Sequence, residues 1–181
     1  MINKIIVEGP NNVGKSTFIN SLLQSPEFED WSVEHVTSAA PNDFNFYNKT
    51  LLNAKNVIFD RHCIGELVYP SLYKRAAKVN LCQVNKLLKK YCENTLIFFI
   101  DADYTFIANA CKNKNEGFDI DFVTNERNSF NCVYKKLRHH KNVNRIINHI
   151  DARYYSEMNM ADALTLAKYT YAEELVDEIC I

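Results

Sequence analysis

Eight residues near the N-terminus constrain the fold of this chain more than any others. Gly9–Ser16 reads GPNNVGKS and fits the pattern G-x-x-x-x-G-K-[ST] in full. The two glycines let the backbone curl so that successive N–H groups face a polyphosphate, and the positive end of a following helix adds to the attraction. An apolar run precedes the motif and a helical pattern follows it. The sequence therefore predicts a strand, a phosphate-binding loop and a helix, rather than a tight turn that binds nothing.

The residues of this loop have distinct expected roles. Lys15 is expected to reach the β- and γ-phosphates, and the Ser16 hydroxyl is expected to bind Mg²⁺. The chain has only four glycines, two of them in this motif, and a chain this poor in glycine places them where only glycine fits. The residues expected to bind the phosphate donor here are Gly9, Asn11, Asn12, Val13, Gly14, Lys15, Ser16 and Thr17.

Short apolar runs alternate with longer helical patterns along the rest of the chain. Strands are expected at residues 2–8, 31–37, 56–60, 95–101 and 145–150. This alternation predicts a parallel sheet with helices on both faces. No linker or repeat divides the 181 residues, so we expect a single domain, 1–181. A polar stretch at about 112–123 predicts a loop, and the next helix is expected from Thr124.

Composition and charge argue against several classes of protein. The 21 Lys and Arg residues nearly balance the 22 Asp and Glu residues, so nucleic acid is not an expected partner. The longest apolar run, Leu96–Ile100, is too short to span a membrane. The six cysteines form no Cys-x-x-Cys pair, and the N-terminus lacks the apolar segment of a signal peptide. These features favour reduced thiols and a cytoplasmic protein.

A second motif, FDRH, ends the third expected strand. It puts Asp60 and Arg61 at the carboxyl edge of the sheet, where open α/β folds bind ligands. A carboxylate there can hold Mg²⁺ or its water, and an arginine can clamp an anionic oxygen with two parallel hydrogen bonds. The structural alternative is a helix cap followed by an exposed arginine.

With these residues in view, the sequence resembles the thymidylate kinase-like family of P-loop nucleotide kinases, which includes the deoxynucleoside kinases. The resemblance rests on VEGPNNVGKST, on VIFDRH followed by GELVYP in a form typical of viral and phage members, and on FFIDAD, NERNSFNCVYKKL and NHIDA. It implies a P-loop NTPase three-layer α/β sandwich with a five-stranded parallel sheet and a short lid at about 112–123. It also implies ATP and Mg²⁺, a deoxynucleoside or its monophosphate as acceptor, a possible homodimer, and the host cytoplasm for a viral member.

The resemblance assigns roles by position. Asp60 would organise the metal, and Arg61 would bind the acceptor's phosphate or orient its attacking oxygen. The remaining assignments, each with surface charge or packing as its alternative, put Phe44, Glu66 and Tyr69 on the acceptor side, Lys112 and Lys114 in the lid, Arg127 beside the transferred phosphoryl group, and Arg153 by the adenine.

Departures from the family pattern bear on the acceptor. The expected lid has lysines where the family has arginines. A lysine cannot bind two phosphate oxygens at once with parallel hydrogen bonds, as an arginine can. After the second expected strand, HVTSAAPND contains no carboxylate before Asp43. A nucleoside hydroxyl benefits from such a base, whereas a monophosphate is already anionic. We therefore expect transfer to a deoxynucleoside monophosphate, dTMP-like, giving the diphosphate. The alternatives are a deoxynucleoside kinase with Asp60 as base, and a nucleotide-binding module without catalysis.

Overall fold

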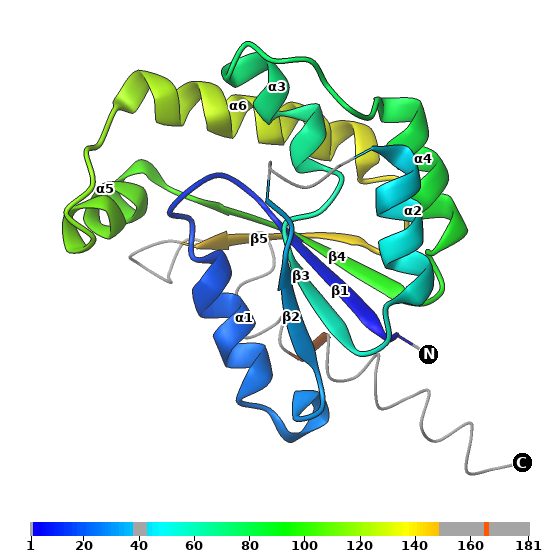
Figure 1. Cartoon of the computed structure of the whole chain (residues 1–181). Coiled ribbons are helices and arrows are strands. Elements are labelled where there is room, and N and C mark those ends of the chain that lie inside the picture. The colour runs from blue at the N-terminus through cyan, green and yellow to red at the C-terminus, as the bar shows by residue number, and fades with distance from the viewer. Residues whose placement is uncertain (1, 38–42, 149–164, 167–181) are drawn as a thin grey trace, which may run out of the picture.

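A five-stranded parallel sheet forms the centre of the molecule (Figure 1). The computed structural model describes residues 2–37, 43–148 and 165–166. The strands are β1 (Lys4–Glu8), β2 (Ser32–His35), β3 (Val57–Asp60), β4 (Thr95–Ala102) and β5 (Val143–Asn148), in the spatial order β2-β3-β1-β4-β5. Every neighbouring pair is parallel. The α/β fold and the parallel sheet predicted from the sequence are therefore confirmed.

Helices cover both faces of this sheet. The described α-helices are α1 (Lys15–Leu23), α2 (Phe44–Asn53), α3 (Tyr69–Leu72), α4 (Leu81–Lys90), α5 (Tyr104–Asn113) and α6 (Ile120–Leu137). Two short 3₁₀ helices, η1 (Pro26–Phe28) and η2 (Gly65–Leu67), complete the set. Within the described residues, no helix has both the length and the apolarity needed to cross a bilayer.

Alternation along the strands divides the apolar core into two layers. Ile5 and Val7 of β1 face α1 and α5, whereas Ile6 between them faces α2, α4 and α6. Side chains of successive strand residues point to opposite faces, so a strand buried on both faces reads as an unbroken apolar run. The polar residues Glu8, His35 and Asp60 end β1, β2 and β3 at the carboxyl edge of the sheet, where a site can form.

The connection between α5 and α6 differs from the expected loop at about 112–123. The helix α5 continues through Asn113 and α6 begins at Ile120, so only residues 114–119 connect them. The cause is a helix cap that the sequence reading missed. The Asp119 side chain accepts hydrogen bonds from the N–H groups of Asp121 (3.0 Å) and Phe122 (3.1 Å), which starts the helix before Thr124. The expected residue Arg153 lies outside the described residues.

The backbone leaves β1 through a close approach that only glycine permits. Gly9 has φ of 147°, and a Cβ built on it would lie 2.0 Å from the carbonyl oxygen of Ile100 in β4. Gly14, with φ of 96°, caps the N-terminus of α1 in the left-handed region. The two glycines of the motif therefore fix where the phosphate-binding loop starts and where α1 begins.

Replacing Gly9 with alanine is expected to destabilise the protein by at least about 2 kcal/mol, because the new methyl group overlaps the backbone of β4 and φ is unfavourable. The matched control is Gly117→Ala, where no atom lies within 4 Å of the added Cβ. Urea denaturation of both variants measures the difference. Equal stabilities of the two variants would contradict the assignment.

Candidate functional site

Two cavities meet at the carboxyl edge of the sheet. The first, about 400 Å³, is lined by the phosphate-binding loop, by Asp60 and by residues around the α5–α6 connection; we call it the loop cavity. The second, about 620 Å³, is lined by Tyr47, Tyr69 and Tyr73 among others; we call it the aromatic cavity. Asn11, His35 and Arg61 line both. These three residues form the boundary across which the contents of the two cavities would meet.

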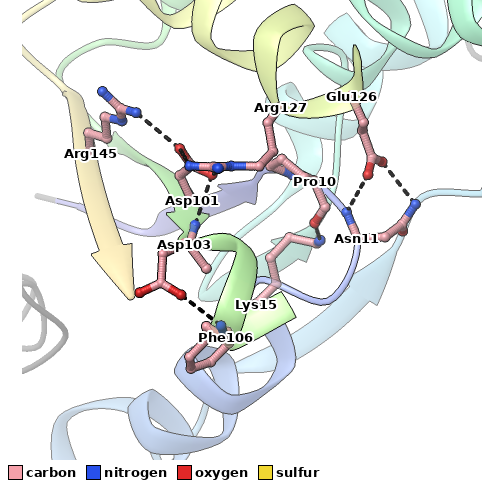
Figure 2. Close-up of polar contacts among 10 residues, drawn as sticks. Pro10, Asn11, Lys15, Asp101, Asp103, Phe106, Glu126, Arg127 and Arg145 are labelled. Carbon is pink, nitrogen blue, oxygen red and sulfur yellow. Dashed lines mark hydrogen bonds and ion pairs between the residues drawn. The ribbon is translucent and has the colours of Figure 1, made fainter. Parts of the chain in front are cut away.

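The Lys15 side chain lies beneath the loop, with only 8% of its surface exposed. Its Nζ donates to the carbonyl oxygens of Gly9 (3.1 Å) and Pro10 (Figure 2). Burial lowers the pKa of this amine to about 7. The loop carbonyls thus hold Lys15 in the wall of the cavity, where phosphate oxygens would offer it stronger, charged acceptors.

Two asparagines attach the loop to the helices that follow β4. The N–H and Nδ2 of Asn11 donate to the Glu126 carboxylate of α6 at 3.1 and 2.8 Å (Figure 2). Asn12 donates to Glu116 Oε2 (2.9 Å) and accepts from Lys114 Nζ (2.7 Å). The loop is therefore held by α6 and by the α5–α6 connection as well as by β1.

Arg61 occupies the boundary between the cavities. Its backbone has φ of 70°, and its Nη2 donates to Asn11 Oδ1 at 2.7 Å. Its Nη1 donates to the Gly9 carbonyl (3.3 Å) and to the Tyr69 hydroxyl, and the guanidinium lies 4.9 Å from the centre of that ring. The structure thus brings together Arg61, Tyr69 and the phosphate-binding loop, which the sequence reading had put at one site.

Asp60 lines the loop cavity, and its two carboxylate oxygens have different surroundings. Its Oδ2 lies 3.0 Å from His35 Nδ1, whereas its Oδ1 is buried and has no hydrogen-bond partner among the described residues. Asp60 and Ser16 line the same cavity. Mg²⁺ prefers oxygen ligands and is usually bound by one or two protein groups together with substrate phosphates. A carboxylate and a hydroxyl that line one cavity fit that requirement.

The aromatic cavity contains a buried ion pair. Arg75 donates to both oxygens of Glu66 at 2.9 and 2.6 Å, with the Glu66 carboxylate 4% exposed and the Arg75 side chain 29% exposed. The ring of Tyr73 stacks on that of Tyr69, with centres 5.8 Å apart. Glu66 and Tyr69, which the resemblance puts on the acceptor side, thus line one cavity; their role stays a prediction.

Three expected residues lie away from both cavities. Arg127 pairs with Asp101 through two hydrogen bonds of 2.8 and 3.1 Å and stacks on Tyr104, while Arg145 binds the same carboxylate (Figure 2). Lys112 is exposed in the last turn of α5, in contrast to Lys114, which lines the loop cavity. Phe44, the first residue of α2, packs against the core, and Tyr47, one turn later, lines the aromatic cavity instead.

The sequence reading missed four residues of the site: Glu8, His35, Arg75 and Glu126. Glu126 is next in sequence to Arg127, and the resemblance assigned the catalytic role to Arg127 alone. His35 ends β2 in register with Asp60, so the rule that parallel strands expose their carboxyl ends at one edge could have found it. His62, which follows Arg61 in the FDRH motif, is buried and is hydrogen-bonded to Thr50 through Nε2 at 2.9 Å, and burial lowers its pKa to about 3. It is a neutral part of the wall.

Glu8, the last residue of β1, links the loop to the turn that contains Arg61. It is fully buried, and its Oε1 accepts from the N–H groups of His62 (2.7 Å) and Gly65 (3.3 Å). Burial raises the pKa of this carboxyl from 4.5 to about 7, against the opposing effect of Arg61. A buried acid with a raised pKa favours the folded state when protonated.

The effect of Glu8 on stability should therefore depend on pH with a defined sign. Its contribution to the free energy of unfolding is fully present below about pH 4.5 and is lost as the pH rises through about 7. The free energy of unfolding changes by up to about 3 kcal/mol over this range. Relative to wild type, Glu8→Gln should gain stability over this window because the amide does not titrate. Urea unfolding of both proteins at pH 5, 6, 7 and 8 measures the difference in their free energies of unfolding. A difference that does not change with pH would contradict the prediction.

Comparisons with known proteins identify the fold. No protein-family model and no curated sequence matches the chain. A YorR protein from Bacillus subtilis, in complex with phosphorylated GDP, aligns with a TM-score of 0.66 and 18% identity over 94% of this chain and 96% of that one. Deoxyadenosine kinase from M. mycoides, with dCMP and dCDP bound, aligns with a TM-score of 0.57 and 13% identity over 94% of this chain and 98% of that one. Thymidylate kinase from Candida albicans aligns with a TM-score of 0.53 and 12% identity over 96% of this chain and 92% of that one. The chain shares the fold of nucleotide kinases.

Proposed function

We propose that this protein transfers a phosphoryl group from ATP, with Mg²⁺, to a deoxynucleoside monophosphate and so forms the diphosphate. The observation that carries the proposal is the pair of cavities joined at Asn11, His35 and Arg61. A protein that only binds or hydrolyses a nucleotide needs a phosphate site alone, whereas a kinase needs a second cavity opening onto it. The kinase fold of the structural neighbours supports this reading.

In this proposal the loop cavity receives the phosphates of ATP. The N–H groups of the loop and the start of α1 bind them, and Lys15 exchanges the Gly9 and Pro10 carbonyls for phosphate oxygens. Ser16 and Asp60 hold Mg²⁺, which neutralises the charge that develops on the phosphates when bound. Catalysis of this kind is mostly positioning and electrostatic stabilisation.

The aromatic cavity receives the acceptor, with its phosphate toward Arg61. Arg61 already contacts the loop through Asn11 and Gly9, so it can bind an acceptor oxygen next to the γ-phosphate. The carboxylate in this cavity, Glu66, is engaged by Arg75 and is not available as a base. An acceptor that is already anionic suits that environment better than a hydroxyl, which must lose a proton. The dTMP-like base follows from the resemblance, and a panel of acceptors tests it.

A deoxynucleoside kinase is the second candidate, favoured by the unpaired Oδ1 of Asp60, an oxygen that could accept a proton from a hydroxyl. A binding module without catalysis is the third. It is favoured by the pairing of Arg127 with Asp101 and by the α5–α6 connection, which offers Lys114 but no arginine.

Lys15→Ala should lower turnover by at least about a hundredfold, because the amine acts on charge developing in the transition state. Release of ADP, measured over a panel of deoxynucleosides and their monophosphates, gives both the turnover and the preferred acceptor. The control is Lys89→Ala, at an exposed position near the end of α4. No ADP release above background with any acceptor, in a protein that binds ATP, would favour the binding module.

Arg61 distinguishes the two kinase candidates. For a monophosphate acceptor, Arg61→Ala should raise KM for that acceptor by about tenfold or more, since a charge-assisted contact is lost. The KM of Arg61→Lys should lie between those of the wild type and Arg61→Ala, because lysine keeps the charge but cannot donate two parallel hydrogen bonds. Both constants are measured for the monophosphate and for the matching nucleoside. A selective fall in turnover on the nucleoside would instead indicate a nucleoside kinase.

A further inference from the structure

His35 lies at the boundary of the two cavities and no part of the mechanism above uses it. It is the last residue of β2 and is paired in register with Asp60, the last residue of β3. Residues opposite each other on neighbouring strands place their side chains on the same face of the sheet. The imidazole therefore reaches the carboxylate across the edge of the sheet, with Nδ1 at 3.0 Å from Oδ2.

We propose that His35 is a positioning residue for Asp60, whose bond to Oδ2 fixes the orientation of the carboxylate at the wall of the loop cavity, where Mg²⁺ would bind. The inference rests on the proposed function. A carboxylate acts only as an acceptor, so Nδ1–H is the donor and this bond fixes the rotation of the carboxylate plane. The other oxygen, Oδ1, stays buried and unpaired among the described residues. The carboxylate is therefore held in one orientation beside the cavity that it shares with Ser16, and a fixed oxygen ligand suits the strict octahedral geometry of Mg²⁺.

Lys15 explains why Asp60 needs such a partner. The charge of Asp60 raises the pKa of the Lys15 amine, against the larger effect of burial. The two groups therefore attract each other electrostatically. Without His35, Asp60 could rotate toward that amine and form an ion pair. Such a pair would withdraw both groups from the nucleotide at once, so the imidazole keeps a cation ligand and a phosphate ligand apart.

A purely structural role explains the contact less well. The side chain of His35 is 52% exposed, and all four residues of the edge strand β2 are exposed. Hydrogen-bonded pairs at such positions contribute little to stability. By contrast, partners that orient a metal-binding carboxylate typically change metal affinity by 10- to 100-fold when they are removed.

The test measures metal binding directly, without turnover. Mn²⁺ replaces Mg²⁺, and the loss of the free-ion signal in electron paramagnetic resonance gives its affinity for the protein saturated with ADP. His35→Ala should weaken Mn²⁺ binding about tenfold, whereas the affinity for ADP in EDTA stays unchanged. His35→Asn should restore binding, because its amide nitrogen lies near the position of Nδ1. His35→Gln, whose amide lies near Nε2, should not.

His139→Ala is the control, since that histidine is exposed beyond the end of α6. Thermal melting of each variant shows whether a loss of binding comes from a loss of folding. Wild-type Mn²⁺ affinity in His35→Ala would overturn the inference, and so would an equal loss in the alanine and asparagine variants when both fold normally. If the wild-type protein binds ADP but no Mn²⁺, both the metal site and this role of His35 are wrong. If the wild-type protein binds both, then wild-type Mn²⁺ affinity in His35→Ala contradicts the role of His35 alone, and the kinase proposal remains.

Discussion

The side chain of Asn11 connects three segments that are far apart in the sequence. Its amide nitrogen and backbone N–H bind Glu126 of α6, and its oxygen accepts from Arg61 in the turn after β3. Every polar atom of the side chain thus has a defined partner, so the amide has one orientation. That orientation sets where the phosphate-binding loop lies relative to the acceptor arginine. An aspartate at this position would put a carboxylate against Glu126 and lose the side-chain hydrogen bond to it.

The acidic and basic side chains of the site largely offset one another's charge. The buried or half-buried carboxylates Glu8, Asp60 and Glu126 surround the cations Lys15 and Arg61. Such a site has little net positive charge with which to attract a polyphosphate. The backbone N–H groups of the loop, the start of α1 and a divalent cation must therefore supply the attraction. In the proposed mechanism, the carboxylate of Asp60 beside the loop therefore matters as much as the lysine within it.

Much of the fold and part of the site followed from local sequence. The strand–loop–helix unit at Gly9–Ser16 and the placement of Asp60 and Arg61 depend on neighbouring residues, and so do the parallel strands. The residues that were missed depend on distant partners. His35 becomes significant only through its register with Asp60, and Glu126 only through the rotation of α6, which begins before the expected Thr124. Arg75 lies in an irregular segment where no periodicity constrains its direction.

The pairing of Glu66 with Arg75 has a consequence for how this cavity can change during evolution. Loss of Arg75 would leave a carboxylate buried at 4% exposure without its cation, a severe penalty. Loss of Glu66 would leave an arginine that is already 29% exposed and can turn toward solvent. Substitutions are therefore tolerated in one order only, with the carboxylate replaced first and the arginine afterwards. New acceptors would be reached through intermediates that keep the cation.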